Sequence, residues 1–383
     1  MAEEKPPHNS KPAARGKQPT ERKRMETVRK MRVGVIGTGA ISDIYLQNMI
    51  NRFEQLEVVS VAAKHRENAR KKAVQYGLED CTVEEMLADP RIEMVVILTP
   101  VGTHYNLIKA ALLAGKHVYT EKTITDDLAK AEELLVLAEE KQLYLGSAPD
   151  TFLGAAWQTA KKVIDEGRLG EIHSFAITAN RNNDVLQARF KFLREPKAGV
   201  LLDYAVYYMT ALVSLLGPVE KVAGFVSTPY PTRTVILPDS PEYGHTISTP
   251  NESEVSAILR LKNGISGTFH IDTESNTYNE SAFVIYGARG ILYLPNSNEF
   301  GGSVKFAPDT MDWDKPAVME DIPLEFPYAD NSRGIGPAEM AEAIWEKRKN
   351  RASKEMAYHV LEVLTAIQKS SENEVFCDIR FTL

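Results

Sequence analysis

The chain has 383 residues, 43% of them hydrophobic and 25% charged, which is ordinary for a soluble globular protein and long enough for two domains. No apolar run approaches the roughly 20 residues of a membrane-spanning helix, so we expect no membrane partner. Cys81 and Cys377 lie far apart without metal-ligand spacing. This spacing argues against a disulfide framework and a metal site and predicts a cytoplasmic protein.

The formal net charge of −7 conceals an uneven distribution. Residues 1–30 are rich in Lys, Arg and Pro and lack the apolar region of a signal peptide, whereas the rest of the chain is acidic. We interpret residues 1–30 as a disordered basic tail, with a polyanion-binding arm as the alternative. An acidic body does not suit nucleic acid as the main partner.

The segment 32–42 is an apolar strand that runs into a glycine turn and then a helix. Gly37 suits the tight turn, and Gly39 lets a pyrophosphate approach the backbone. Ala40 and Ile41 follow where the helix opens and its free N–H groups face the anion. These four residues are therefore predicted to bind the phosphates of a dinucleotide.

Short, buried-looking strands alternate with helices from residue 31 to residue 149. We expect the strands at 33–36, 58–63, 94–98, 117–120 and 143–147. Thr82 and Glu85 form a capping box before one helix, and Asp127 begins another. The alternation predicts an α/β fold: a doubly wound parallel sheet of the Rossmann type over residues 31–149.

After residue 149 the pattern becomes that of an α+β domain, residues 150–383. Helices are expected at 152–167, 201–216, 337–349 and 354–369; strands at 171–180, 254–261, 265–273, 281–286, 290–294 and 374–380; and surface loops at 228–250 and 307–327. The β-rich segments are separated by turns, which favours a large, mostly antiparallel sheet.

The end of the second expected strand bears on the choice of cofactor. Ala63 stands where an acidic residue would accept the ribose 2′-OH of NAD. Lys64 and Arg66 follow with charge suited to a 2′-phosphate. We therefore favour NADP over NAD, although a basic turn can equally be the solvated start of a helix.

Five ordered motifs resemble the GFO/IDH/MocA family (glucose-fructose oxidoreductase / inositol dehydrogenase), and the similarity extends from residue 32 to the C-terminus. The motifs are GTGAIS at 37–42, TPVGTH at 99–104, AGKHVYTEK at 114–122, GRLGEIHSF at 167–175 and GVLLDYAVYY at 199–208. The resemblance implies NAD(P), a sugar, cyclitol or related polyol as substrate, and a homo-oligomer, dimer or tetramer, formed through the open-faced sheet of the C-terminal domain.

In this family the lysine of the EK motif lies between nicotinamide and substrate, a place that Lys122 takes here, after Glu121. Its charge would favour a developing alkoxide. Thr99, Pro100 and His104 would line the nicotinamide side. The plainer alternatives are a surface lysine at a turn and a histidine that merely begins a helix.

The segment 199–216 departs from the family's pattern of an aspartate followed four residues later by an acid/base histidine. Here the pair is Asp203 and Tyr207, which the spacing places on one helix face. Three interpretations stay open: Tyr207 is the acid/base, supported by the charge of Lys122; Tyr207 binds substrate while Lys122 handles the proton; or redox activity is lost.

Polar residues at loop ends are candidate substrate contacts, namely Asp150, Asn180 and Asn182, with simple solvation as the alternative. We expect an oxidoreductase that moves a hydride between nicotinamide and a secondary alcohol of a polyol. Lys122 and Tyr207 would handle the proton. Two alternatives remain: a redox-coupled enzyme that modifies or cleaves glycosides with tightly bound NAD, and a non-catalytic protein that senses nucleotide or sugar.

Overall fold

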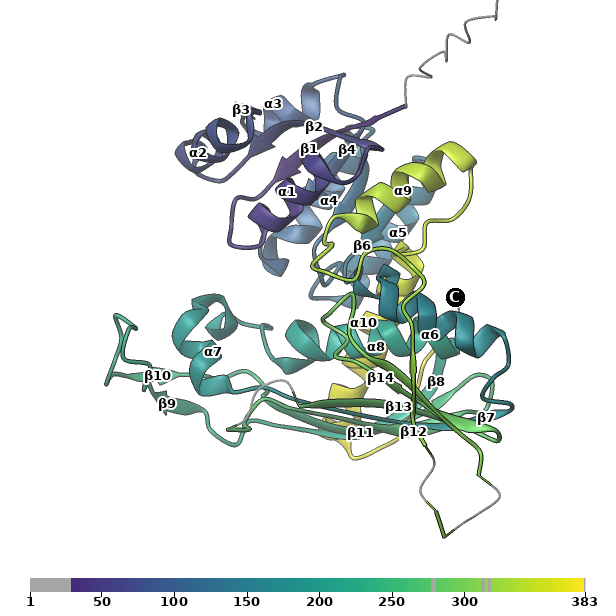
Figure 1. The fold of residues 1–383 in the computed structure, drawn as a ribbon. Helices are drawn as coiled ribbons and strands as arrows, with labels where there is room; N and C mark the ends of the chain where they lie inside the picture. Colours follow the sequence, from purple (N-terminus) through teal and green to yellow (C-terminus); the bar gives the residue numbers. More distant parts are fainter. Residues whose placement is uncertain (1–28, 277–279, 311–313, 316–317, 382) are drawn as a thin grey trace, which may run out of the picture.

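The computed structural model describes residues 29–276, 280–310, 314–315, 318–381 and 383. All but the last two residues of the predicted basic tail therefore lie outside the described residues. Residues 31–149 lie at the top of Figure 1, and the large sheet formed by later residues lies at the bottom.

The described part of residues 31–149 forms a parallel sheet in the order β3-β2-β1-β4-β5-β6. Its strands are β1 (Met31–Ile36), β2 (Leu56–Ala62), β3 (Glu79–Cys81), β4 (Met94–Ile97), β5 (His117–Thr120) and β6 (Leu145–Ser147). This is the strand order of a Rossmann domain, whose ligands bind at the carboxyl ends of the strands. The predicted doubly wound sheet is confirmed.

Helices cover both faces of this sheet: α1 (Ser42–Asn51), α2 (Arg66–Tyr76), α3 (Val83–Ala88), α4 (His104–Leu113) and α5 (Leu128–Glu140). The predicted capping box is present, because the Thr82 side chain accepts from Glu85 N and the Glu85 side chain accepts from Thr82 N. Asp127 caps α5 by accepting from Lys130 N. These local signals fix where the helices begin.

The second half of the described chain forms a mixed sheet in the order β16-β15-β14-β13-β7-β12-β11-β8-β17. The strands are β7 (Ile172–Asn180), β8 (Val219–Ser227), β11 (Glu254–Leu261), β12 (Ser266–Asp272), β13 (Ser281–Gly287), β14 (Gly290–Leu294), β15 (Val304–Pro308), β16 (Glu320–Ile322) and β17 (Cys377–Asp378). Only the β7–β12 pair is parallel among the described pairs of this sheet. The mostly antiparallel sheet is thus confirmed.

One face of this sheet packs against α6 (Ala155–Asp165), α8 (Val206–Leu216) and α10 (Lys354–Asn373). Phe225 on β8 and Ile258 on β11 point to the opposite face, where they are 69% and 50% exposed. Helices therefore bury one side of the sheet, and apolar side chains remain exposed on the other.

The segment 331–353 returns from the second domain to the nucleotide domain. Asn48 on α1 donates to the carbonyls of Asn331 and Arg333, and Ser147 N on β6 donates to Ala352 O. The helix α9 (Ile335–Glu346) lies within this segment and packs beside β6. The two domains are thus joined by the polypeptide at 149–150 and again by this returning segment.

Several short elements lie inside segments that the sequence pattern had left as loops or turns. Residues 228–250 contain β9 (Thr232–Thr234) and β10 (Thr246–Ser248), and residues 307–327 contain β16. A further helix, α7 (Asn183–Arg189), follows β7 directly. No described helix combines the length and the apolar character needed to cross a membrane.

Candidate active site

The turn between β1 and α1 has the shape that a dinucleotide phosphate requires. Gly37 has φ +116, and a Cβ there would lie 2.7 Å from the carbonyl of Leu98. A Cβ on Gly39 would meet nothing within 4 Å, so the backbone there faces open space. In the described chain no side chain caps α1 at Ile41. Ser42 N donates to Gly39 O at 3.0 Å, and no described side chain competes with an anion for the N–H groups that follow, so the residues fit a pyrophosphate.

The basic residues after β2 differ in what they contact. Ala63 is half-buried, and Lys64 is exposed without an ion pair among the described residues. Arg66 begins α2, where its guanidinium lies 3.0 Å from Asp80 Oδ2. Its charge is thus already paired within the protein, whereas the ammonium of Lys64 remains available.

His104 ties together the two loops that end β4 and β5. It is fully buried, with Nδ1 2.7 Å from Thr123 O and Nε2 2.7 Å from Thr99 O. Burial lowers its pKa, while the two carbonyls oppose that shift. His104 therefore holds Thr99 in place, and Pro100 beside it is exposed.

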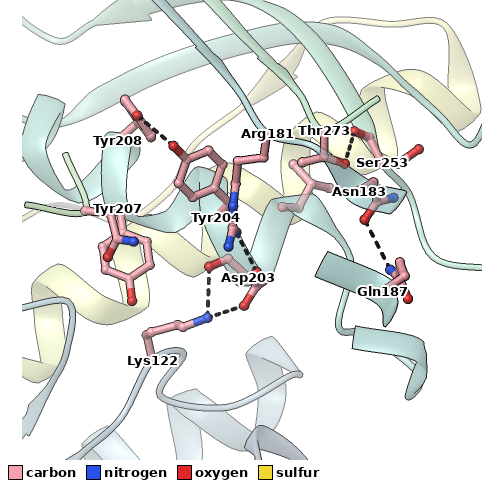
Figure 2. A network of polar contacts seen from close by, with 12 residues as sticks. Lys122, Arg181, Asn183, Gln187, Asp203, Tyr204, Tyr207, Tyr208, Ser253 and Thr273 are labelled. Atoms are coloured by element: carbon pink, nitrogen blue, oxygen red, sulfur yellow. Dashed lines mark hydrogen bonds and ion pairs between the residues drawn. The ribbon is translucent and has the colours of Figure 1, made fainter. Parts of the chain in front are cut away.

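Glu121 and Lys122 leave the end of β5 in different directions. The buried Glu121 accepts from Tyr45 OH at 2.7 Å and from Lys122 N at 3.1 Å. The Lys122 side chain crosses to the second domain, where Nζ donates to the backbone O of Asp203 at 2.8 Å and to its Oδ1 at 2.6 Å. Figure 2 shows this lysine reaching from the nucleotide domain to the aspartate.

Asp203 lies between two cations on a π-helical turn, Leu201–Ala205, that leads into α8. Its Oδ2 accepts from Arg181 at 3.1 Å, while Oδ1 accepts from Lys122. Burial raises the pKa of Asp203, but the two cations outweigh burial and hold it below its usual value. Burial likewise lowers the pKa of Lys122, but Asp203, with Tyr207 and Glu121, raises it above its usual value. Both groups are thus held in their charged forms.

Tyr207 lies one helical turn after Asp203, as the spacing predicts, and is 8% exposed. Lys122 Nζ is 5.7 Å from the centre of its ring, within cation–π range. On the other side, Arg333 Nη2 lies 3.5 Å from its hydroxyl oxygen. The phenol is therefore flanked by two cations, one from each of two distant segments.

A second layer of side chains supports this arrangement. The Arg181 guanidinium stacks on the ring of Tyr204, 4.4 Å from its centre. The hydroxyls of Tyr204 and Tyr208 are 3.1 Å apart, and Tyr208 donates to Asn296 Oδ1 at 2.9 Å. Figure 2 shows Arg181 and Tyr204 packed behind Asp203. This packing restricts the directions that Arg181 and Asp203 can take.

A cavity of about 20 Å³ lies beside Asp203, between β7, α7 and the start of the π-helical turn. It has room for about one water-sized group. Arg181, Asn183 and Gln187 line it, and Gln187 Oε1 is buried without a hydrogen-bond partner in the described residues. An unpartnered buried acceptor is costly unless a water or ligand donates to it.

The three predicted substrate contacts use their polar atoms within the protein itself. Asp150 is 1% exposed, and its Oδ2 accepts from the N–H groups of Gly334 and Gly336. Asn182 caps α7 through Val185 N, and Asn180 Oδ1 accepts from Glu280 N. The roles of Asp150, Asn180 and Asn182 as substrate ligands remain predictions. In this structure each of these side chains already accepts a hydrogen bond from a backbone N–H group of the protein.

Two arginines that the motif analysis did not single out also belong to the site. Arg181 lies inside the polar cluster 180–184, between the predicted Asn180 and Asn182. Its charge at the end of a strand is the signal that could have identified it. Arg333 follows Tyr207 by 126 residues in a loop, where no spacing rule points to it. Among the described residues, no group of three or more His, Cys, Asp or Glu side chains could hold a metal ion.

Two family models match the chain. The oxidoreductase family with an NAD-binding Rossmann fold matches residues 31–148, and the GFO/IDH/MocA C-terminal domain matches residues 157–293. Together they cover more than half of the chain, and both halves of the fold described above are included.

Curated relatives match mainly over one half of the chain. One is scyllo-inositol 2-dehydrogenase (NADP(+)) IolW of Bacillus subtilis, 27% identical over 54% of this chain and 56% of that protein. Another is dTDP-3,4-didehydro-2,6-dideoxy-alpha-D-glucose 3-reductase of Streptomyces violaceoruber, 32% identical over 52% of this chain and 59% of that protein. The chain thus spans little more than half the length of these relatives.

Solved structures match over nearly the whole chain, at identities that speak for the fold alone. A levoglucosan dehydrogenase in complex with NADH and L-sorbose has a TM-score of 0.79 at 21% identity, covering 92% of this chain and 99% of that one. An NAD-binding oxidoreductase from Klebsiella pneumoniae has a TM-score of 0.80 at 18% identity, with the same coverage. The chain therefore belongs to the GFO/IDH/MocA oxidoreductase family and carries its NAD-binding Rossmann domain and its C-terminal domain.

Proposed function

We propose that this protein is an NAD(P)-dependent dehydrogenase that moves a hydride between the nicotinamide and a secondary alcohol of a sugar, cyclitol or related polyol. The observation that carries the proposal is the Lys122–Asp203 pair, which joins the two domains at 2.6 Å with Tyr207 one helical turn away. This is where the carboxyl end of β5 meets the second domain, and ligands of such folds bind at strand ends.

The proposed division of labour follows from the charges. Since Asp203 keeps the pKa of Lys122 raised, the lysine acts as a fixed donor that stabilises an alkoxide, not as a proton acceptor. Tyr207 is then the group that takes the hydroxyl proton and returns it in the reverse direction. Asp203 orients Lys122, and Arg181 holds Asp203.

The dinucleotide supplies the hydride acceptor when it is bound. Gly37, Gly39, Ala40 and Ile41 would hold its pyrophosphate, and Thr99, Pro100 and Glu121 would surround its nicotinamide end. We propose NADP as the preferred form, because Ala63 offers no carboxylate to a ribose hydroxyl and Lys64 has no partner in the described part of the chain. Arg66 contributes less, since Asp80 already holds its guanidinium.

A polyhydroxylated substrate is supported by the polar surroundings of Asp203. The cavity beside Asp203 takes one group of about the size of a hydroxyl, and Gln187 Oε1 needs a donor there. A second substrate hydroxyl supplies such a donor. The inositol and sugar-nucleotide enzymes among the relatives act on substrates of this kind by their names.

The direct test begins with the purified protein, denatured to release and identify any nucleotide. That nucleotide, or NAD and NADP in parallel, is then offered with a panel of polyols and their keto forms while nicotinamide absorbance is followed. We expect reduction with at least one secondary alcohol. Bound nucleotide with no absorbance change on any panel member would favour a sensing protein, and cleavage of a glycoside without net reduction would favour the redox-coupled alternative.

We further propose that the protein assembles as a homo-oligomer through the sheet face that no described helix covers. Phe225 and Ile258 are exposed there on neighbouring strands. Exposed apolar side chains on a sheet face mark a contact surface. Light scattering should give a mass above that of one chain, and a Phe225→Arg variant should lower it.

A further inference from the structure

Arg333 is a buried cation whose polar contacts are unusual. Its side chain belongs to the loop before α9 and is 9% exposed. Nη2 donates to Asn298 Oδ1 at 2.6 Å and Nη1 to Asn331 Oδ1 at 2.9 Å. A buried guanidinium normally has a carboxylate partner, yet in the described chain Arg333 forms no ion pair.

The third contact of Arg333 distinguishes it from a structural arginine. Nη2 also lies 3.5 Å from the hydroxyl oxygen of Tyr207, at the long end of the hydrogen-bond range. The oxygens of Asn298 and Asn331 belong to amide groups, which do not ionise. Of the three oxygens around this guanidinium, the Tyr207 oxygen alone can acquire a negative charge, and hydrogen bonds to an ionised acceptor become shorter and stronger.

The guanidinium is also held in place from several sides. Asn48 on α1 donates to the Arg333 carbonyl at 2.9 Å, and the ring of Phe300 lies 5.8 Å from the guanidinium carbon. Burial lowers the pKa of Arg333, but Tyr207, Glu121 and Tyr45 together raise it above its ordinary value. Arginine keeps its protons throughout the accessible pH range, so this cation is a permanent one.

The other charged groups near Tyr207 are already compensated. The charged and titratable groups that interact with Tyr207 are Lys122, Tyr119 and Arg333. Asp203 binds Lys122, and Glu121 and Tyr45 act on Arg333. Asp203 accepts from Lys122 and Arg181, and Glu121 accepts from a tyrosine hydroxyl and a backbone N–H. Arg333 is influenced by the charges of Glu121 and Asp150 but pairs with neither among the described residues, and its Nη2 lies within hydrogen-bond distance of the Tyr207 oxygen.

We propose that Arg333 is a positioning residue that stabilises the negative charge on the Tyr207 oxygen whenever its proton is away, and so supports the exchange of a proton between Tyr207 and the substrate. This inference rests on the proposed function, in which Tyr207 is the proton carrier. Arg333 thus takes over part of what the family's histidine supplies through its own ring.

The chemistry balances as follows. In the oxidising direction the proton of the alcohol O–H bond passes to the Tyr207 oxygen, and the carbinol C–H bond breaks with its electron pair going to C4 of the oxidised nicotinamide dinucleotide. The C–O bond becomes a carbonyl. Arg333 forms and breaks no covalent bond; it loses a charged acceptor when Tyr207 is protonated and regains it when the proton leaves.

The test compares Arg333→Gln and Arg333→Lys with the wild type over a range of pH, using the nucleotide and polyol found in the absorbance screen. We expect Arg333→Gln to lower kcat about 10²- to 10³-fold near neutral pH and to move the acidic limb of the kcat profile upward by about one to three pH units. Arg333→Lys keeps the charge and should recover much of the loss.

A matched control is Arg52→Gln. Arg52 also holds the 328–334 segment, through Asp330 at 2.9 Å and the ring of Tyr328, but does not contact Tyr207. The Arg52→Gln variant should have the same pH profile of kcat as the wild type. A uniform loss of kcat in Arg333→Gln without movement of the profile, or the same movement in Arg52→Gln, would overturn the inference.

Two further variants distinguish a failure of the Arg333 inference from a folding defect and from a failure of the proposed function. If Arg333→Gln does not fold, Arg333→Met takes its place as the variant without the charge. A displaced profile in Arg333→Met that Arg333→Lys brings back supports the inference, and a wild-type profile in Arg333→Met contradicts it. If Tyr207→Phe retains wild-type turnover and profile, the proposed role of Tyr207 fails, and the failure lies with the proposed function.

Discussion

Replacing Asp203 by asparagine tests the Lys122–Asp203 ion pair with almost no change in the shape of the side chain. The substitution keeps the size of the side chain but removes the negative charge between Lys122 and Arg181, which it contacts at 2.6 and 3.1 Å. The two cations are only 16% and 15% exposed. They would face each other across a neutral amide, with Lys122 losing the interaction that keeps its pKa raised.

Two magnitudes follow for Asp203→Asn. Removing one partner of a buried charge pair costs about 3–5 kcal/mol, and we expect the lower end because both cations retain some solvent contact. For catalysis, a misaligned lysine removes one donor to the developing alkoxide, which costs about 10²- to 10³-fold in kcat. Nucleotide affinity should change little, since the phosphate turn follows β1, which is separated by β4 from β5, the strand that precedes Lys122.

The assay measures denaturant unfolding, nucleotide binding and kcat on the same preparations. Asp184→Asn is the matched control, because Arg233, 7% exposed, lies between Asp184 and Glu274, and none of these three forms an ion pair with Lys122, Arg181 or Asp203 in the described chain. This control should lower stability without lowering kcat per folded molecule. If folded Asp203→Asn, binding nucleotide normally, turned over within about tenfold of the wild type, the assigned role of Asp203 would be refuted.

Two further predictions concern the cofactor and the pH dependence of stability. Lys64→Ala should weaken NADP binding about 10- to 100-fold, as expected for one charge-assisted contact, and leave NAD binding nearly unchanged; equal effects on both in a titration would contradict the 2′-phosphate contact. Burial raises the pKa of Asp150 to about 6, against the backbone donors of Gly334 and Gly336, so its ionisation opposes folding above pH 6. Compared with the ordinary pKa of 3.8, this value corresponds to a loss of about 3 kcal/mol in the free energy of unfolding. Asp150→Asn should recover that free energy at pH 7.5. The stability difference between variant and wild type should shrink as the pH falls from 6 toward 3.8. A difference in urea midpoints that stays constant with pH would contradict this.

Local chemistry made much of the nucleotide domain predictable. The strands of its sheet are buried on both faces and read as short apolar runs, and the caps at Thr82 and Asp127 begin their helices as expected. The spacing of Asp203 and Tyr207 survives the π-helical turn because both still lie on the same side of the segment. These features depend on residues within a few positions of one another.

The rest of the site depends on contacts between distant segments, which no local pattern encodes. Arg333 reaches Tyr207 because residues 331–353 return to the nucleotide domain after β16, when only β17 of the large sheet is still to follow. Asp150 has the polar character of a ligand, yet the N–H groups that begin α9 bury it. The sequence indicates which residues can bear a charge, but only the fold determines which of these charges come together at the candidate site.

Hydride transfer itself can be followed with a polyol carrying deuterium on its reacting carbon, incubated with the oxidised nucleotide and analysed by mass spectrometry and NMR. Our account predicts deuterium at C4 of the reduced nicotinamide in the wild type and at least a hundredfold slower labelling in Lys122→Met that still binds the nucleotide, an estimate of about 10²-fold per lost alkoxide donor. Nucleotide bound by the wild type without deuterium transfer from any polyol of the panel would contradict it.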